Sequence, residues 1–523
     1  MRYQWYLGFA LFLIVCFLFL ASVQHPRWFL VLLGAFLLLW LYDILQTKHT
    51  VLRNFPILGH IRYFFEFMRP EVQQYFIATD ESELPFNRED RSLIYERAKN
   101  ERDTIPFGTE RDILSVGYTW ALHSLAPKKA SEVSARLIVG GPDCLQPYNA
   151  SRLNISAMSF GALSGKAIMA MNQGAKIGGF AQNTGEGGLS PYHLQGGDLI
   201  FQIGTAYFGC RNAAGHFDPE EFAKEANRPE VKMIEIKLSQ GAKPSHGGIL
   251  PAAKLTQEIA SVRKVPMGQD VLSPIAHTAF DTPVGLLEFV RQLRHLSQGK
   301  PVGFKLCLGR RDEFLAICKA MLRTHILPDF ITIDGAEGGT GAAPLEYADF
   351  IGTPLEAGLV FVHNALVGIH VRDKIRLICS GKITNGFDML SKIALGADMC
   401  NAARAMMMAT GCIQSKQCNA NTCPTGVTTQ NKRLQYGLVV ADKRHRVANF
   451  HKNTLKSFLE MVGALGLDDP SDLRPAHLMR RVSVVEVKTF DKIYDYLAPG
   501  QLLTAQIPAS YKTYWDMADP ERF

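Results

Sequence analysis

From about residue 150 onward, short apolar runs alternate with amphipathic segments along the chain. Apolar runs of four to eight residues bounded by glycine-rich turns are typical of buried strands, and apolar residues at helical spacing indicate covering helices. The predicted strands lie within residues 153–160, 178–185, 199–205, 231–238, 301–308, 329–336, 376–382 and 398–405. The predicted helices include residues 165–177, 286–296, 313–325 and 386–395. This alternation predicts an α/β fold, a (β/α)8 barrel of the TIM type.

Polar and glycine residues follow many of the predicted strands. The segments are "SFGA", "NTGEGG", "SQGAKPSHGG", "DGAEGGTGAAP" and "SGKITNG". In a (β/α)8 barrel the loops at the carboxyl ends of the strands build the active site. We therefore expect these segments to meet on one face of the barrel.

The N-terminus carries two apolar runs of membrane-spanning length, Trp5–Val23 and Trp28–Leu45, separated by "QHPR". A cleaved signal peptide is the alternative for the first run, because "LASVQ" is similar to a cleavage site. The short segment between the two apolar runs contains one basic residue, Arg27. The segments that flank the two runs contain more basic residues: Arg2, Lys48, Arg53, Arg62 and Arg69. The positive-inside rule then predicts a two-helix transmembrane hairpin over residues 1–46, a multi-pass membrane protein and a cytoplasmic catalytic domain.

The predicted barrel domain, residues 150–435, lies between two extensions. Residues 47–149 are expected to form a juxtamembrane helical extension. Its aromatic and basic segment around residues 54–76 lies either at the membrane interface or against the main domain. Residues 436–523 are expected to form a helical C-terminal extension that packs against the barrel.

Composition excludes one large class of partners. The chain has 523 residues, of which 47% are hydrophobic, and a net charge of +7. This is enough for a large core, and the positive charge is spread without basic runs or a basic–aromatic stripe. We therefore expect no nucleic-acid partner.

Three of the ten cysteines, Cys412, Cys418 and Cys423, lie within residues 411–427. Disulfides use cysteines in pairs, and zinc sites usually combine two closely spaced C-x2-4-C pairs, whereas here only Cys418 and Cys423 have that spacing. A loop with three thiolates suits an iron–sulfur cluster, and a reducing cytoplasm suits such ligands. The alternative is three free or buried cysteines that fall together by chance.

The other cysteines and histidines give weak signals. No metal-binding pattern joins His193, His216, His277 and His363, which are interpreted as ordinary surface or core residues. Cys400 is a conceivable fourth cluster ligand, but a small buried hydrophobic residue is the preferred interpretation.

Five motifs in order resemble the synthase domain of glutamate synthase, which binds FMN and iron–sulfur. They are "AMSFGALS", "NTGEGG", "KLSQGAKP", "DGAEGGTGAAP" and "GCIQSKQCNANTCPTGVTTQ", within roughly residues 150–435. The resemblance implies an FMN-binding barrel and a [3Fe–4S] cluster held by Cys412, Cys418 and Cys423.

The resemblance also implies the residues that bind FMN: Met158, Ser159, Gln240, Lys305, Gly338, Gly339, Gly341, Gly381 and Arg404. Glycine loops leave backbone N–H groups accessible to a phosphate. Where the family usually has "GFGTA", this chain has "NAARA", so Arg404 either pairs with the phosphate or forms a structural ion pair. Lys305 is expected near the flavin ring, and a buried lysine there requires an anionic neighbour.

For the substrate, the resemblance implies Lys237, Gln240, Lys243 and His246, with Glu186, Lys237 and Lys243 as catalytic residues. Glu186 is a candidate acid–base group if burial raises its pKa, or else a cap of its loop. The family reads "GAKPGEGGQ" where this chain reads "GAKPSHGGI", so His246 and Ile249 replace an acid and an amide. A carboxylate left unpaired by Ile249 loses about 1–3 kcal/mol, which puts 2-oxoglutarate in doubt.

The expected function is an oxidoreductase acting on CH–NH2 groups in glutamate biosynthesis. Flavin would transfer hydride to 2-iminoglutarate, and electrons would come from an external carrier: a ferredoxin-like protein, a reductase subunit or quinone. No G-x-G-x-x-G motif, ferredoxin-type cysteine run or amidotransferase domain is found, so we expect external electrons and ammonia. The alternatives are a membrane-bound amino-acid or amine dehydrogenase that reduces quinone, and a non-catalytic electron-transfer or scaffold subunit.

Overall fold

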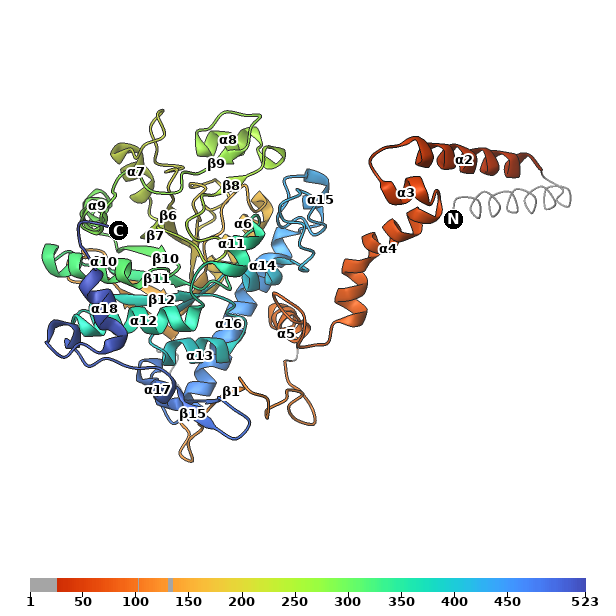
Figure 1. The fold of residues 1–523 in the computed structure, drawn as a ribbon. Helices are drawn as coiled ribbons and strands as arrows, with labels where there is room; N and C mark the ends of the chain where they lie inside the picture. Colours follow the sequence, from red (N-terminus) through yellow and green to blue (C-terminus); the bar gives the residue numbers. More distant parts are fainter. Residues whose placement is uncertain (1–25, 102, 130–134) are drawn as a thin grey trace. The chain divides into compact units, whose positions relative to one another are not determined.

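A closed barrel of eight parallel strands forms the centre of the unit that spans residues 89–523 (Figure 1). The computed structural model describes residues 26–101, 103–129 and 135–523, and the chain divides into two compact units, Met1–Arg88 and Glu89–Phe523. The barrel strands follow chain order: β4 (Leu153–Ile155), β5 (Ala181–Asn183), β6 (Asp198–Ile203), β7 (Val231–Lys237), β10 (Val302–Leu306), β11 (Phe330–Asp334), β12 (Arg376–Ser380) and β13 (Met399–Ala402). Each overlaps one predicted strand, so the predicted (β/α)8 barrel is confirmed.

Helices on the outside of the barrel connect most successive strands. They are α6 (Gly165–Gly178), α7 (Pro219–Ala226), α9 (Pro283–Leu296), α10 (Arg311–Thr324), α12 (Leu355–Gly368) and α13 (Gly386–Ala394). The long α16 (Val440–Ala464) packs against α6, α13 and α14 (Arg404–Thr410), so it takes the helix position that follows β13 (Figure 1). The C-terminal segment therefore completes the outer layer of helices around the barrel.

Local sequence signals set the starts of these helices. Ser164 caps α6 by accepting a hydrogen bond from the Ala167 N–H, and Thr282 caps α9 in front of a proline. Asn385 and Asp388 form a capping box at α13. The strands need no alternation of polar residues, because parallel strands in a barrel are covered on both sides.

A β-hairpin covers the end of the barrel opposite the glycine-rich loops. It pairs β2 (Arg136–Val139) with β3 (Tyr148–Ser151). Its apolar side chains join a buried cluster with residues from six barrel strands; the cluster contains Val139, Tyr148, Ala150, Ala181, Ile200, Met233, Phe330, Ile378 and Met399. The barrel interior at this end is therefore packed with side chains, which favours the opposite end for an active site.

The C-terminal tail contains strands as well as the predicted helices. A three-stranded antiparallel sheet joins β1 (Thr119–Ala121), β14 (Leu478–Arg481) and β15 (Val487–Thr489). The tail continues through α17 (Phe490–Ile493) and ends with α18 (Ala509–Met517), which packs against α10. The sheet links the segment before the barrel to the tail after it.

The predicted transmembrane hairpin is wrong. Its first run, residues 5–23, lies outside the described residues, and its second run lies in α2 (Pro26–Leu45). In the part of the chain that the structure describes, no helix combines the length and apolar character that a bilayer crossing demands. The multi-pass membrane localisation that was predicted from this hairpin is wrong with it.

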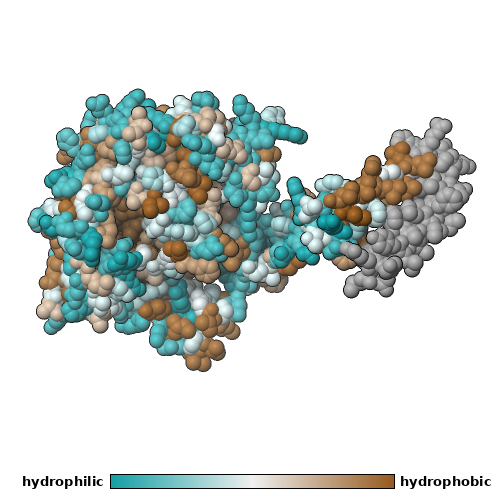
Figure 2. Space-filling view, turned by 45° about the horizontal axis from the view of Figure 1, so that its top comes forward, coloured by the Kyte–Doolittle hydropathy of each residue, from teal (hydrophilic) through white to brown (hydrophobic). Residues whose placement is uncertain are grey.

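Polar anchoring near the end of α2 supplies a physical reason for this correction. Asp43 is fully buried, accepts a hydrogen bond from the Ile57 N–H at 2.8 Å, and lies 2.9 Å from Nε2 of His60. This carboxylate ties α2 to the start of α4 (Leu58–Val72), and the short helix α3 (Thr50–Asn54) lies between them in the chain. Apolar side chains are exposed along α2 and α4 (Figure 2).

Candidate functional site

Two neighbouring lysines at the carboxyl ends of β7 and β10 form the centre of the candidate site. Lys237 and Lys305 are partners in the parallel register, so their side chains enter the barrel mouth side by side. Both are buried, and each has its own carboxylate: Glu186 from the loop after β5, and Asp334 at the end of β11. Opposite charges therefore balance the two ammonium groups, which burial would otherwise make costly.

Glu186 and Lys237 form a close ion pair, with 2.8 Å between Oε1 and Nζ. Burial acts to raise the pKa of Glu186, but Lys237, with Arg263 and Lys243 nearby, outweighs burial and holds that pKa below its usual value. The direction is opposite to the raised pKa expected from sequence. Glu186 is therefore ionised at neutral pH.

A small pocket lies directly beside this ion pair. Glu186, Lys237, Gln240 and His246 line it, together with Thr205, Leu238, Ser239, Ser245, Gly247, Gly248, Pro274 and Ile275. The structure thus brings three of the four predicted substrate residues together. Ile249 is not among the lining residues, since it belongs to β8 (Ile249–Leu250), which pairs with β9 (Val271–Leu272).

Lys243, the fourth predicted substrate residue, is buried close to the ion pair. Burial, reinforced by the neighbouring Lys237, lowers the pKa of Lys243 to about 8, and Glu186 opposes this shift. Lys237, Lys243 and Arg263 place three cations around one carboxylate, so this side of the mouth carries a positive excess.

Lys305 has an anionic neighbour, Asp334, as expected for a buried lysine. Its Nζ lies 3.9 Å from Oδ2 of Asp334, and the same oxygen accepts a hydrogen bond from the Gly241 N–H at 2.9 Å. A Cβ at Gly241 would overlap the carbonyl oxygen of Gly335, so only glycine lets the loops after β7 and β11 approach this closely. Asp334 was not singled out from sequence.

The predicted phosphate residues meet on the other side of the mouth, in the loops after β11, β12 and β13. Nη2 of Arg404 donates to the carbonyl oxygen of Glu337 at 2.7 Å. A Cβ at Gly339 would touch the Arg404 side chain at 2.9 Å, and a Cβ at Gly381 would lie 3.4 Å from the Glu337 carboxylate. The loops after the seventh and eighth strands are where TIM barrels frequently bind phosphate. Gly338 and Gly341 lie in the same loop as Gly339.

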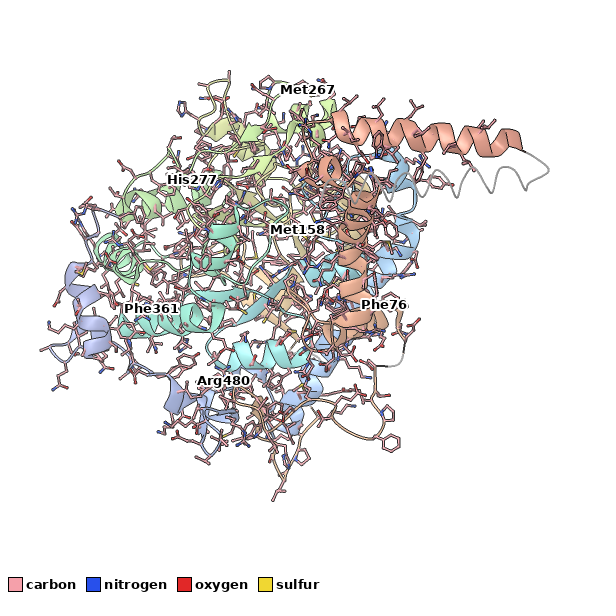
Figure 3. All side chains as sticks on the ribbon, turned by 45° about the vertical axis from the view of Figure 1, so that its right-hand side comes forward. Phe76, Met158, Met267, His277, Phe361 and Arg480 are labelled. Atoms are coloured by element: carbon pink, nitrogen blue, oxygen red, sulfur yellow. The ribbon has the colours of Figure 1, made fainter. Side chains whose placement is uncertain are left out.

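Met158 and Ser159 follow β4, near the middle of the barrel unit, where Figure 3 labels Met158. Gly185 has a left-handed φ of 64°, and a Cβ there would lie 2.6 Å from the Ser159 backbone nitrogen. The loops after β4 and β5 are therefore in close contact. Asn401, on β13, is buried, and its side-chain oxygen has no hydrogen-bond partner within the described residues. An unsatisfied oxygen at the barrel mouth suits a site that accepts a bound group.

The three clustered cysteines influence one another electrostatically. Burial raises the pKa of Cys412 to about 12, and Cys418 and Cys423 add to this effect. Burial also acts on Cys423, but hydrogen bonds from Thr425 and Thr428 outweigh it and lower its pKa. Within the described ranges, no three cysteine, histidine or acidic side chains converge closely enough to hold a single metal ion. Gly341 lies next to Cys418, with 3.6 Å from a Cβ at Gly341 to that of Cys418.

His277, which the sequence suggested to be an ordinary surface or core histidine, is buried next to the site and supports the end of β7 (Figure 3). Its Nε2 lies 2.9 Å from the carbonyl oxygen of Lys237, and its Nδ1 lies 3.1 Å from the Tyr207 hydroxyl. Burial lowers the pKa of His277 to about 4, so the ring is neutral and donates from Nε2. The hydroxyl of Tyr207 also accepts from the N–H groups of Thr278 and Ala279. This network fixes the end of β7, and no spacing in the sequence signals it.

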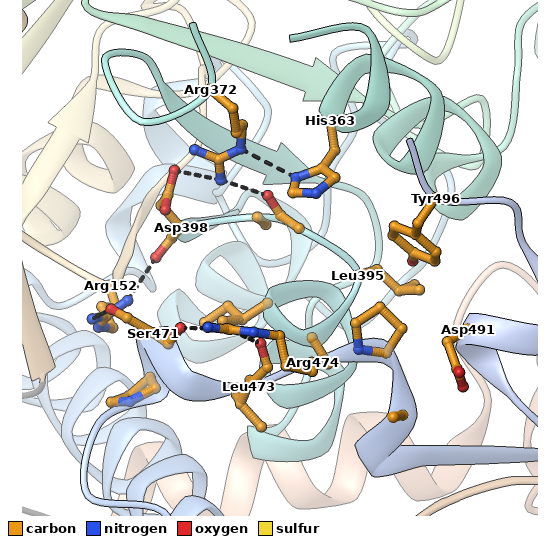
Figure 4. Close-up of a pocket in the computed structure, with 17 residues that line it drawn as sticks. Arg152, His363, Arg372, Leu395, Asp398, Ser471, Leu473, Arg474, Asp491 and Tyr496 are labelled. Atoms are coloured by element: carbon orange, nitrogen blue, oxygen red, sulfur yellow. Dashed lines mark hydrogen bonds and ion pairs between the residues drawn. The ribbon is translucent and has the colours of Figure 1, made fainter. Parts of the chain in front are cut away.

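A larger cavity of about 530 Å³ lies away from these residues, among segments that precede barrel strands (Figure 4). Its polar lining includes Arg152, His363, Arg372, Asp398, Arg474 and Tyr496. Residues at the amino ends of TIM-barrel strands usually serve stability. Chemistry therefore places the candidate active site in the smaller pocket at the opposite mouth.

Comparisons with known proteins identify the family. Residues 123–468 match the family described as "Conserved region in glutamate synthase". The chain is 35% identical over 486 residues to "Glutamate synthase large subunit-like protein YerD" of Bacillus subtilis, covering 84% of this chain and 92% of that one. It is 34% identical to "Archaeal glutamate synthase [NADPH]" of Methanocaldococcus jannaschii, covering 61% of this chain and 60% of the relative.

Similar solved structures include a flavocytochrome b2 variant with sulfite bound. Its TM-score is 0.44 at 13% identity, and the match covers 83% of this chain and 92% of that one. The family assignment rests on the sequence matches alone. The chain belongs to the glutamate synthase family of oxidoreductase enzymes.

Proposed function

We propose that this protein is an FMN- and iron–sulfur-dependent oxidoreductase that interconverts an amino acid and its 2-imino or 2-oxo acid, with 2-iminoglutarate and glutamate as the first candidates. When bound, FMN would exchange hydride with the substrate carbon, and the cluster would pass single electrons to or from an external carrier protein. The observation that carries the proposal is the Glu186–Lys237 ion pair, which lines the small pocket and has two further cations, Lys243 and Arg263, nearby.

The substrate side of the proposal follows from charge. Lys237, Lys243 and Arg263 surround Glu186, which leaves a positive excess that suits the two carboxylates of a dicarboxylic acid. The ionised Glu186 suits the positively charged nitrogen of an amine or iminium group. Gln240 would orient a carboxylate, and His246 takes the place of the family's acid at the pocket rim.

The residues at the mouth fit FMN. Arg404 and the glycine loops after β11 and β12 would hold the phosphate, and the unsatisfied oxygen of Asn401 would accept a hydrogen bond from the cofactor. Lys305, whose charge is only loosely paired with Asp334 at 3.9 Å, would stabilise negative charge on the flavin ring.

The cysteine loop also fits its proposed cofactor. An iron–sulfur cluster takes one thiolate on each of several iron atoms, so its ligands need not converge on a single ion. The Gln414 N–H donates to the Cys412 sulfur, and Thr425 lies at hydrogen-bond distance from the Cys423 sulfur. Such hydrogen bonds stabilise thiolates.

An anaerobic reoxidation assay tests the proposal. The purified protein, reduced with dithionite, is mixed with 2-oxoglutarate and ammonium while flavin absorbance is recorded. We expect reoxidation with formation of glutamate, and loss of that reaction in Lys237→Gln. A preparation without flavin and without iron would overturn the proposal.

A second candidate is an amino-acid or amine dehydrogenase that passes electrons to an external carrier. The ionised Glu186 favours it, because a carboxylate at a pocket attracts a substrate ammonium group. Bleaching of the oxidised flavin by an amine, without any response to 2-oxoglutarate and ammonium, would select this candidate over the first.

A further inference from the structure

Lys254 is a buried cation beside the cysteine loop. It ends a short 3-10 helix, Ala252–Lys254, and only 3% of its surface is exposed. Its ammonium group donates to the carbonyl oxygens of Ala162, at 2.7 Å, and Cys418, at 3.2 Å. One side chain thus joins the loop after β4, which carries Met158 and Ser159, to the loop that carries the cysteines.

No carboxylate in the described part of the chain forms an ion pair with Lys254. Among the ion pairs of the described residues, none includes Lys254, and its two hydrogen-bond acceptors are neutral carbonyl groups. Burial lowers its pKa to about 8, the thiols of Cys418 and Cys423 oppose that shift, and Arg263 adds to it. Within the described residues, the groups whose negative charge would act on Lys254 are the thiols of Cys418 and Cys423 in their ionised form.

A buried ammonium without an anion is unfavourable by several kcal/mol, and carbonyl dipoles compensate only part of this. Neutral thiols would leave Lys254 in that condition. Thiolates bound to iron would supply the missing negative charge, and they would do so within the same loop that the ammonium group already contacts.

We propose that Lys254 is the electrostatic partner of the iron–sulfur cluster and raises its reduction potential. The inference rests on the proposed function, since it requires the cluster. Reduction adds one electron and hence one negative charge, so a nearby buried cation stabilises the reduced cluster more than the oxidised one. Lys254 is distinct from the ligands: it acts by charge and does not bind iron.

A redox titration followed by electron paramagnetic resonance tests this role in the full-length holoprotein. Dithionite supplies the electron, and the variants are Lys254→Met, Lys254→Arg and Lys264→Met. Lys264 is a matched control, because it lies in the same connection between β7 and α9, but its side chain is half exposed and forms an ion pair with Glu221.

We expect Lys254→Met to lower the equilibrium constant for cluster reduction at least tenfold, which is about 59 mV for a one-electron couple. Lys254→Arg should retain most of the wild-type potential, and Lys264→Met should match the wild type. A midpoint in Lys254→Met equal to that of the wild type would overturn the inference while leaving the cluster itself established.

Loss of the cluster in Lys254→Met is a separate outcome, and the Lys254→Arg variant then tests the inference. If Lys254→Met folds with wild-type circular dichroism but lacks iron, then Lys254→Arg must restore iron and sulfide, because the role requires only a cation. Failure of that rescue overturns the inference. Wild-type protein without iron and sulfide, even after anaerobic reconstitution, overturns the proposed cluster and the role of Lys254 together.

Discussion

Replacing Lys237 by methionine should destabilise the protein by stranding a buried carboxylate. The 2.8 Å pair has exposed side-chain fractions of only 9% and 17%. At an effective dielectric constant near 20, the attraction at this distance is about 6 kcal/mol before desolvation is subtracted. Removal of one partner from a buried pair usually costs about 3–5 kcal/mol. Because Arg263 and Lys243 still face Glu186, we expect the lower end, about 3 kcal/mol.

This cost converts into a small but measurable shift of the thermal midpoint. For the unit spanning residues 89–523, an unfolding entropy of about 2.1 cal/mol/K per residue gives roughly 0.9 kcal/mol/K. Lys237→Met should therefore lower Tm by about 3 °C. Glu186→Gln should lower it by at least as much, because it leaves the buried Lys237 ammonium, with Lys243 and Arg263 nearby, without its carboxylate. Scanning calorimetry at a fixed scan rate provides the measurement.

The double variant and a surface control decide whether the pair is the cause. The double variant removes both charges, so its loss should be smaller than the sum of the single losses. Lys512→Met removes an exposed ion pair with Asp516 and should change Tm by less than about 1 °C. Strictly additive losses at Lys237 and Glu186, or a Lys237→Met midpoint equal to the control, would refute the reasoning.

The pH dependence gives an independent arm of the same test. The folded-state pKa of Glu186 lies below its unfolded value, so its stabilisation is present above about pH 4.5 and is lost as the pH falls through the folded pKa. The stability difference between the wild type and Glu186→Gln should therefore shrink on acidification from pH 6 to pH 3. A difference that grows over this interval would contradict the lowered pKa.

Three further changes test other parts of the site. Arg404→Gln should weaken FMN binding by about 10- to 100-fold in a fluorescence titration, because it removes one charge-assisted contact with the phosphate. Binding of riboflavin, which has no phosphate, should be unchanged, and an equal loss of affinity for both ligands would contradict a phosphate role. Gly241→Ala should abolish flavin retention, because its methyl group would overlap the Gly335 carbonyl oxygen; wild-type flavin absorbance per chain would contradict this. Asp90→Asn should raise Tm at pH 8 but not at pH 4. Burial, with Asp388 nearby, raises the Asp90 pKa to about 6, so the wild type loses stability as the pH rises through that value, whereas the variant does not. A change in Tm that is independent of pH would contradict this prediction.

The barrel strands were predictable because each is buried on both sides. Parallel strands such as β7 and β10 are covered on both sides, so each reads as a continuous apolar run between glycine-rich turns. The loops that follow them carry the polar motifs, so the meeting of Lys237, Gln240 and His246 at one pocket follows from the topology.

The pairings within the site were not predictable, because they join residues far apart in the chain. Nothing near Lys305 in the sequence indicates that Asp334 supplies its counter-charge, and nothing near His277 indicates Tyr207. The lowered pKa of Glu186 depends on three cations that converge only in the folded barrel. Burial of Lys254 likewise depends on the approach of two distant loops.

The N-terminus shows where composition alone misleads. Apolar content over residues 28–45 suggested a membrane span, but composition does not reveal that Asp43 is buried and bonded to the following helices. The C-terminal segment shows the converse case. Its amphipathic helix α16 was predictable as a helix, whereas its position between α6 and α13 as part of the barrel was not.

Incorporation of isotope-labelled ammonium into glutamate tests the central claim most directly. The protein is reduced anaerobically, mixed with 2-oxoglutarate and labelled ammonium, and the products are analysed by mass spectrometry. We predict labelled glutamate with the wild type and strongly reduced labelling with Lys237→Gln, because that variant removes the ammonium group at the pocket. Fully flavin-loaded wild-type protein that forms no labelled glutamate, while an amine reduces its flavin, would contradict the synthase assignment.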